Sequence, residues 1–248
     1  MMATVVAFHA HPDDEALLTG GYLAARAAHG DRVVLVVATD GGAGLADPTF
    51  RDLGVTRVRE LDEAARHLGV ARVVRLGYAD SGMAHSPTTG EGRFVDADPE
   101  QAARRLADIL DVEAADVLTG YDARGGYGHP DHVQVHRVAR LAQGIATQRP
   151  RLLEATRDRT LLVRGIRLTR PVARAFPGIT LPGTAIYSAR DEITHRVDVR
   201  PYLPNKRAAL AAHASQTTGG VRTIGVLLRL PPWITRRLLG VECFVEVP

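Results

Sequence analysis

The sequence predicts an α/β protein with a Rossmann-like, mostly parallel sheet flanked by helices and a less regular C-terminal portion. Its 248 residues, 45% hydrophobic and 24% charged, are typical of a globular chain that buries a large core. Short apolar runs of strand length alternate with longer segments of helical period, as in β-α-β units. Because no repeat or linker divides the chain, we expect one domain over residues 1–248, with a core at 1–150 and an extension at 151–248 that completes the pocket.

The first 150 residues read as strands and helices in alternation. Apolar runs of strand length cover residues 5–8, 33–39, 73–76 and 117–120. Apolar residues at helical spacing cover residues 15–28, 55–68, 99–110 and 132–148. Gly30 and Gly69 follow the first two helices, where glycine commonly ends a helix. Asp98 and Pro99 supply an N-cap and a first helical residue for the third. Further on, the candidates are strands at 161–168 and 193–199 and a helix at 204–213.

Composition excludes several classes of protein. The 31 basic and 28 acidic residues are interspersed, so we expect no nucleic-acid partner. Apolar runs such as residues 33–38 fall far short of the ~20 residues of a membrane span, and a strand at residues 5–8 leaves no room for a signal peptide. We therefore expect a cytoplasmic protein that does not insert stably into membranes. The single cysteine, Cys243, leaves histidine and carboxylate as the ligands for any metal.

Two polar clusters follow predicted strands. The segment H-A-H-P-D-D-E occupies residues 9–15, and G-G-Y-G-H-P-D-H occupies residues 125–132. A strand-to-helix turn alone would explain the acids of the first cluster but would leave its histidines unused. In open α/β sheets, the carboxyl ends of neighbouring strands converge on one crevice. A catalytic zinc site takes three nitrogen or oxygen ligands and keeps one position open, and His11, Asp14 and His132 supply such a set.

These two motifs resemble those of the LmbE-like (PIG-L) family of zinc-dependent N-deacetylases, which remove acetyl groups from N-acetylglucosaminyl conjugates. The resemblance covers residues 5–138 and, more weakly, residues 206–216. Segments 80–83, 94–98 and 125–127 are similar to the actinobacterial branch that contains the mycothiol-pathway GlcNAc-inositol deacetylase and its amidase relative.

The resemblance implies a role for each polar residue of the motifs. It implies His11, Asp14 and His132 as ligands of zinc, for which another divalent ion such as Fe²⁺ is the alternative. It also implies that Asp13 acts as the general base toward water, that His129 and Tyr127 face the reacting carbonyl, and that Asp131 orients His129. Zinc lowers the pKa of a bound water from 15.7 to roughly 7, which amide hydrolysis needs at neutral pH. The full set is His11, Asp13, Asp14, Tyr127, His129, Asp131 and His132.

Other residues are candidates for substrate binding. Arg57 and Glu60 match the substrate-side helix of the family, although an exposed i,i+3 ion pair is an equal alternative. Asp80 and Ser81 follow the third predicted strand and are further candidates. The chain departs from the family at Gly42, where members often have glutamate, and this leaves the identity of the substrate open.

Some features have weaker interpretations. His136 lies one helical turn after the second cluster and is either a fourth ligand or, as we expect, a support for the ligands. His9 at the first strand end reads as a core or supporting histidine. Residues 206–216, which include Lys206, His213, Ser215 and Gln216, resemble a family segment and are expected to form a pocket wall. Residues 219–240 combine arginines with large apolar residues, which predicts an oligomer contact or lid or, alternatively, a membrane-surface patch.

Together these observations predict a zinc-dependent hydrolase that removes an N-acetyl group from an N-acetylglucosaminyl-type conjugate. One alternative is an N-deacylase or amidase of a specialised metabolite such as a glycosylated antibiotic. A remote alternative is a non-catalytic α/β binding module. All three predicted ligands are present and no G-x-G-x-x-G follows the first strand, which disfavours that module. The expected partners are a small amino-sugar conjugate and a second copy of the chain that docks through residues 219–240.

Overall fold

The computed structural model describes residues 2–44, 52–83, 86–88, 90–160, 163–164, 186–217 and 223–248. A seven-stranded sheet in the order β3-β2-β1-β6-β7-β9-β8 runs through these residues. Its strands are β1 (Thr4–His9), β2 (Arg32–Thr39), β3 (Arg72–Tyr78), β6 (Val117–Tyr121), β7 (Arg151–Thr156), β8 (His195–Asp198) and β9 (Val241–Glu246). Strands β3 to β7 of this order are parallel, and β9 runs antiparallel to both β7 and β8. The predicted mostly parallel α/β fold is confirmed.

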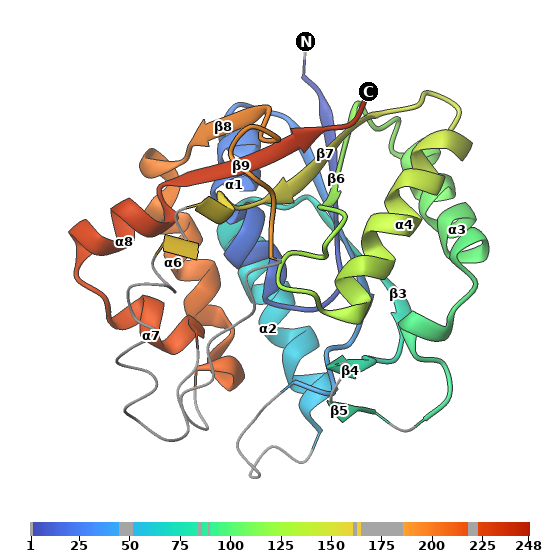
Figure 1. Ribbon diagram of the computed structural model, residues 1–248, viewed down its shortest axis with the longest axis horizontal. Helices are drawn as coiled ribbons and strands as arrows, with labels where there is room; N and C mark the ends of the chain where they lie inside the picture. Colours follow the sequence, from blue (N-terminus) through green and yellow to red (C-terminus); the bar gives the residue numbers. More distant parts are fainter. Residues whose placement is uncertain are drawn as a thin grey trace.

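Helices cover both faces of the sheet (Figure 1). Helices α1 (Gly20–Ala28), α2 (Leu53–Leu68) and α6 (Leu203–Ala212) pack on one face, and α3 (Pro99–Val112) and α4 (Pro130–Ile145) pack on the other. Val5 and Ala7 of β1 belong to the first core, and Val6 and Phe8 belong to the second. Because both faces are buried, β1 and β2 read as nearly continuous apolar runs without polar alternation.

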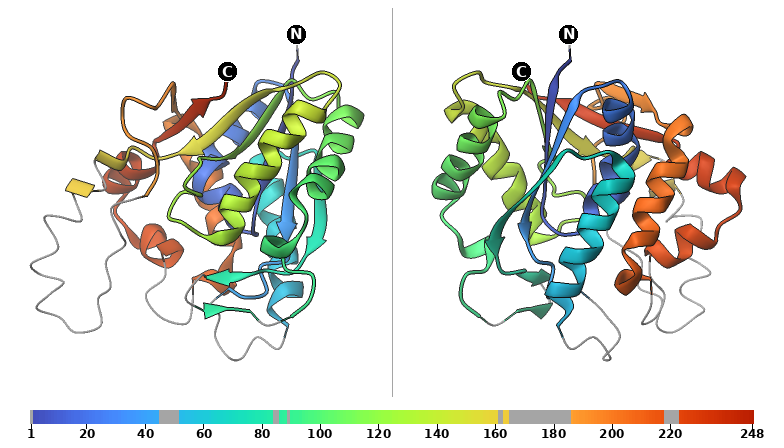
Figure 2. Two further views of the ribbon diagram at one scale, coloured as in Figure 1. Left: turned by 45° about the vertical axis from the view of Figure 1, so that its right-hand side comes forward. Right: turned by 180° about the vertical axis from the view of Figure 1, so that it is seen from behind.

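The strand order reverses between β1 and β6. From β1 the chain proceeds through α1 to β2 on one side, whereas β6 leads through α4 to β7 on the other. The loops at the carboxyl ends of β1 and β6 therefore diverge toward opposite faces, and they leave a crevice where open α/β sheets bind ligands. In both views of Figure 2, the hairpin of β4 (Gly82–Met83) and β5 (Ser86–Pro87) lies at the end of the molecule away from both chain termini.

Most predicted elements of the core are confirmed within a few residues, but the first helix is not continuous. Residues Glu15–Thr19 form a π-helical turn, and α1 begins only at Gly20. The Thr19 hydroxyl donates to the Glu15 carbonyl at 3.2 Å, and the Glu242 carboxylate accepts from the main-chain N–H of Gly21 at 2.9 Å. A π-helical turn of this kind commonly marks a functional site.

The C-terminal part contains strands that the sequence pattern did not reveal. The segment predicted at 193–199 forms β8 and the helix predicted at 204–213 is α6, but β7 and β9 were missed. The strand predicted at 161–168 falls largely outside the described residues. Residues 223–240 form α7 (Thr223–Arg229) and α8 (Pro232–Leu239), and residues 219–222 lie outside the described part. None of the helices described is both long and apolar enough to cross a bilayer.

Candidate active site

His11 lies among three carboxylates at the carboxyl edge of the sheet. Its Nδ1 is 3.2 Å from Asp14 Oδ2, and its Nε2 is 3.1 Å from Asp131 Oδ2 and 3.5 Å from Asp80 Oδ1. All four side chains are buried. The turns after β1, β3 and β6 thus bring residues far apart in the sequence to one point, as the converging strand ends predict.

His132 comes from the first turn of α4, and its ring stacks on Tyr121 with centroids 4.3 Å apart. Its Nε2 is 3.2 Å from Asp14 Oδ2, but this pair is not aligned as a hydrogen bond. Within the described part of the chain, neither buried ring nitrogen of His132 has a hydrogen-bond partner. The ligand atoms of His11, His129 and His132 all lie within 4.8 Å of one another. A second such group comprises His11, Asp80, His129 and Asp131.

This arrangement fits a divalent metal. Asp14 Oδ2 lies 3.2 Å from a ring nitrogen of both His11 and His132, so the three predicted ligands meet around one carboxylate oxygen. The two groups of mutually close ligand atoms described above both include His129, which the sequence predicted to face the substrate, and neither includes Asp14. A cation would supply the partner that the buried His132 nitrogens lack. The donors are imidazole and carboxylate, which suit zinc and other divalent transition metals.

Each of these groups shifts the pKa of the others. Burial alone would lower the pKa of His11, but hydrogen bonds to the surrounding carboxylates outweigh burial and hold this pKa well above its usual value. Burial would raise the pKa of Asp14, but the neighbouring His132 and His11 hold it well below the usual value. The pKa of Asp80 is lowered against burial by its hydrogen bond to His11. The carboxylates therefore stay ionised at neutral pH and hold a proton on His11, which a divalent ion bound here would have to displace.

Asp13 faces the pocket and contacts none of the ligand nitrogens described above. Its Oδ2 lies 3.0 Å from Arg57 Nη2, and its main-chain N–H donates to Glu15 Oε2 at 2.9 Å. Burial raises the pKa of Asp13 to about 6, and the positive charge of Arg57 opposes this rise. A carboxylate beside the ligands that remains free to accept a proton has the chemistry of a general base.

A glycine-rich loop carries Tyr127 and His129. Gly125, Gly126 and Gly128 adopt positive φ angles of 59°, 63° and 91°, which explains why this turn needs glycine. The Tyr127 side chain lines the pocket and remains 45% exposed. Asp122, which no sequence motif singled out, supports the loop because its Oδ1 accepts from the main-chain N–H of Gly126 at 3.1 Å.

His129 is held by Asp131 through the main chain. The N–H of Asp131 donates to His129 Nδ1 at 3.2 Å, so Nδ1 is the acceptor and the ring proton sits on Nε2. The Asp131 carboxylate itself contacts His11 and Ser81. Burial, with the nearby His11 and His132, lowers the pKa of His129 to about 4.

Arg57 is buried, which excludes the alternative of an exposed ion pair with Glu60. Its side chain is 3% exposed, and Nη1 donates to the Gly41 carbonyl at 2.6 Å while Nη2 donates to the Pro12 carbonyl. Glu60 accepts from the N–H and the hydroxyl of Ser215, both at 2.7 Å. Arg57 thus lines the pocket, whereas Glu60 fastens the segment that follows α6.

Of Asp80, Ser81 and His136, only Asp80 lies in the pocket lining, and the other two hold neighbouring residues in place. Ser81 donates its hydroxyl and its main-chain N–H, the latter at 3.0 Å, to Asp131. His136 contacts the Tyr121 carbonyl at 3.1 Å and a Glu154 oxygen at 3.0 Å, so it supports α4 and belongs to neither group of ligand atoms described.

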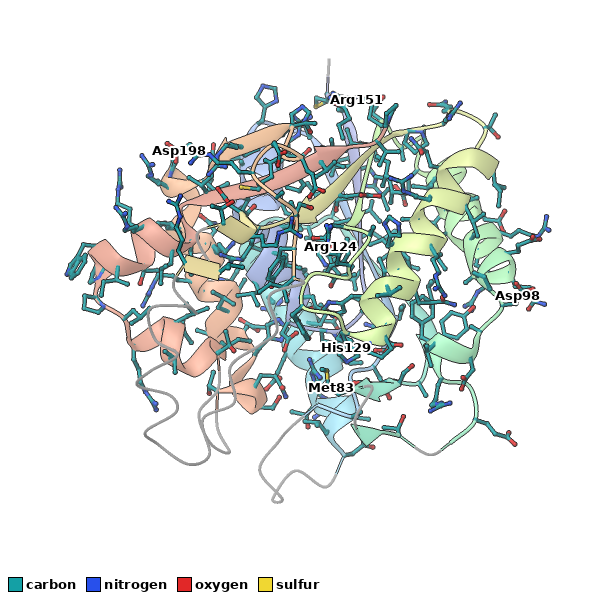
Figure 3. All side chains as sticks on the ribbon, in the orientation of Figure 1. Met83, Asp98, Arg124, His129, Arg151 and Asp198 are labelled. Atoms are coloured by element: carbon teal, nitrogen blue, oxygen red, sulfur yellow. The ribbon has the colours of Figure 1, made fainter. Side chains whose placement is uncertain are left out.

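A pocket of about 230 Å³ opens over these residues. Figure 3 shows two residues of its lining, Met83 and His129, near each other at the end of the molecule away from the chain termini. The lining comes from the loops after β1, β2, β3 and β6, from helix α2 and from the segment after α6. It comprises His11, Asp13, Asp14, Ala43, Gly44, Arg57, Asp80, Gly82, Met83, Tyr127, His129 and Gln216. Gln216 is the part of the predicted C-terminal wall that reaches this lining, whereas Lys206 forms a buried ion pair with Glu242.

Comparison with known proteins places these motifs in context. The family model described as PIG-L: GlcNAc-PI de-N-acetylase matches residues 6–143. A 1D-myo-inositol 2-acetamido-2-deoxy-alpha-D-glucopyranoside deacetylase from Thermomonospora curvata is 37% identical over 261 residues, which cover 95% of this chain and 87% of the relative. The protein of the same name from Acidothermus cellulolyticus is 36% identical over 266 residues, which cover 99% of this chain and 89% of the relative.

Solved structures share the fold at lower identity. N,N'-diacetylchitobiose deacetylase from Pyrococcus horikoshii has a TM-score of 0.65 at 22% identity and covers 99% of this chain and 84% of its own. A 4-carboxy-2-hydroxymuconate hydratase from Pseudomonas putida has a TM-score of 0.66 at 18% identity, over 100% of this chain and 97% of its own. Because a deacetylase and a hydratase share the fold, the fold alone does not assign the reaction.

Proposed function

Because this chain belongs to the PIG-L family of metal-dependent N-deacetylases, we propose that it hydrolyses the N-acetyl group of an N-acetylglucosaminyl conjugate. One observation carries this proposal: the imidazoles of His11 and His132 both approach Asp14 Oδ2. The neighbouring Asp13 carboxylate contacts Arg57 and neither of these rings. A single pocket therefore offers a metal site and a separate base.

In this proposal His11, Asp14 and His132 hold the metal, with zinc as the expected ion and Fe²⁺ as the alternative. The bound ion would activate water and polarise the amide carbonyl. Ser81 supports the site because its hydroxyl and its main-chain N–H both donate to the Asp131 carboxylate, which contacts His11 Nε2 at 3.1 Å. A ligand held by a second carboxylate keeps its orientation when the metal binds.

Asp13 acts as the general base. Its carboxylate faces the pocket beside the Arg57 guanidinium, where it accepts the proton of the attacking water and returns it to the departing amine as the C–N bond breaks. Arg57 keeps the carboxylate in place and opposes its protonation. Proton transfer to a positioned group of this kind contributes typically 10²–10⁴-fold to the rate.

His129 and Tyr127 stabilise the developing oxyanion. Since His129 Nδ1 accepts from the Asp131 main chain, the Nε2–H is left as a donor toward the pocket that His129 lines. The Tyr127 hydroxyl is a second donor at the same wall. Neutral donors aimed at the carbonyl oxygen stabilise the transition state more than the ground state.

Substrate recognition falls to Asp80 and Arg57 in the pocket lining and to two residues behind it. Asp80 and Arg57 line the pocket and offer a carboxylate and a guanidinium to sugar hydroxyls. Glu60 and Ser81 act on the substrate indirectly, through Ser215 and Asp131. We further propose that residues 151–248 complete this pocket in one domain, that the protein works in the cytoplasm, and that residues 219–240 contact a second copy.

A specialised metabolite bearing an N-acyl group is the second candidate substrate. Among the described residues of the loop after β2, Ala43 and Gly44 line the pocket, and neither has a side chain that can hydrogen-bond to a sugar. An amino sugar attached to a bulkier aglycone can occupy such a wall by apolar contact.

Mass spectrometry of the metal-loaded protein with a substrate panel tests the proposal. The panel contains a GlcNAc-inositol, N,N'-diacetylchitobiose and an N-acylated glycopeptide, and the His132→Ala variant is the matched control. We expect loss of one acetyl unit from an N-acetylglucosaminyl conjugate with the wild type only. Turnover of the glycopeptide alone would select the second candidate, and an unchanged panel would contradict the proposed reaction.

A further inference from the structure

The main chain at Asp13 has an unusual conformation. Its φ angle is 107°, in a region that residues with a side chain rarely adopt. Such conformations persist where the surroundings hold them, and they are often part of a functional site. Here the conformation separates two adjacent carboxylates, because Asp14 Oδ2 lies between His11 and His132 whereas Asp13 Oδ2 faces Arg57 and the pocket.

Two buried residues hold the main chain at this point. Glu15 Oε2 accepts the main-chain N–H of Asp13 at 2.9 Å, and Glu15 Oε1 accepts from His213 Nε2 at 2.7 Å. Both side chains are 0% exposed. Each oxygen of Glu15 therefore has one partner, and the histidine fixes the carboxylate that in turn fixes Asp13.

The segment that carries His213 is itself anchored. His213 directly follows α6, which packs against α1 and α2. Two residues later, Ser215 is bound through its N–H and its hydroxyl to Glu60 of α2. The same helix carries Arg57, which reaches the Asp13 carboxylate. The main chain and the side chain of Asp13 are thus held by residues of α2 and of the segment after α6, which are bound to each other through Glu60 and Ser215.

We propose that Glu15 and His213 are positioning residues for the deacetylation: they lock the main chain at Asp13 so that the base faces the pocket while Asp14 faces the metal ligands. This inference rests on the proposed function. Neither residue lines the pocket, so both act through Asp13. A small displacement of a positioned group can cost up to 10²-fold in rate, which gives such a lock a measurable effect.

The test compares two substitutions of His213 on the zinc-loaded protein. His213→Leu removes the donor to Glu15, whereas His213→Gln keeps an N–H donor on a side chain that can reach the same oxygen. We expect His213→Leu to lower kcat by on the order of 10-fold or more, with KM and bound zinc near the wild-type values, and His213→Gln to restore most of the loss. The control for reduced stability is Leu210→Val, a substitution of a buried residue in α6, the helix that His213 follows. This variant should lower Tm without lowering kcat.

A double-mutant cycle separates positioning from a purely structural role. Because His213 acts through Asp13, its removal in an Asp13→Asn background should cause no further loss of kcat. An equal fold-loss in both backgrounds, or an unchanged kcat in His213→Leu alone, would overturn the inference. If His213→Leu does not fold, Glu15→Gln replaces it in the same cycle, because an amide offers only one oxygen for two donors. Wild-type turnover by Asp13→Asn would instead show that Asp13 is not the general base of the proposed function, so that Glu15 and His213 would have no base to position.

Discussion

Replacing Arg57 by methionine should destabilise the protein strongly. The guanidinium is 3% exposed and bonds the carbonyls of Gly41 and Pro12 and the carboxylate of Asp13. Methionine fills a similar volume but leaves all three acceptors without their donor. A hydrogen bond to a charged group contributes about 1.5–3 kcal/mol, and breaking a buried ion pair costs about 3–5 kcal/mol. Because the Asp13 side chain is 21% exposed, water compensates part of the loss, and we expect about 3–5 kcal/mol in total.

Thermal unfolding measures this effect. For a domain of about 150–250 residues, Tm falls by about 2–4 °C per kcal/mol, so Arg57→Met should melt about 6–20 °C below the wild type. Arg66→Met on the same helix is the matched control, since Arg66 is 71% exposed and pairs with Glu63 at the surface. Such a pair contributes at most about 1 kcal/mol. If both variants melt at the same temperature, Arg57 does not tie the loops together and our reasoning about the site is refuted.

Three further predictions concern separate parts of the molecule. Hydrogen bonds from Arg32 and Arg72 lower the pKa of Glu113 below its ordinary 4.5. The ionised carboxylate therefore stabilises the fold above pH 4.5, and this contribution is lost as pH falls through the folded-state pKa. Glu113→Gln should lower Tm at pH 7 by an amount that shrinks in acid, whereas a Tm difference that does not change with pH would contradict the ion pair. His129→Ala should retain zinc and lose about 10²–10³ in kcat, the effect of one oxyanion donor, and zinc loss instead would make His129 a ligand. Trp233 is 70% exposed on α8 and should lie near the centre of a contact between two copies. In high salt, light scattering should therefore find the wild type as an oligomer and Trp233→Ala as a monomer. A monomeric wild type that binds anionic liposomes only at low salt would favour the membrane-surface alternative.

Much of the fold follows from local sequence patterns. The apolar runs of β1 and β2 are buried on both faces, and the caps at Asp98 and Gly69 lie where the pattern predicts. The two motifs could be placed at one site because the order of strands and helices brings the ends of β1 and β6 together.

The parts that sequence reasoning missed depend on distant contacts. Strand β7 carries the charged Glu154, which is buried because Arg140 of α4 pairs with it at 2.8 Å, and no local pattern reports that partner. The bonds from Glu15 to His213 and from Glu60 to Ser215 span 198 and 155 residues. Glu15 was visible within the first motif, and His213 in the predicted pocket wall, but only the fold reveals that they touch.

Metal content measured together with turnover tests the central claim most directly. In Asp14→Ala the oxygen that both His11 and His132 approach is gone, so the account predicts loss of bound zinc and of activity. Asp13→Asn keeps those atoms and should retain near-stoichiometric zinc while kcat falls by on the order of 10² or more. Full zinc in Asp14→Ala, or wild-type turnover in Asp13→Asn, would contradict the division of roles between the two adjacent carboxylates.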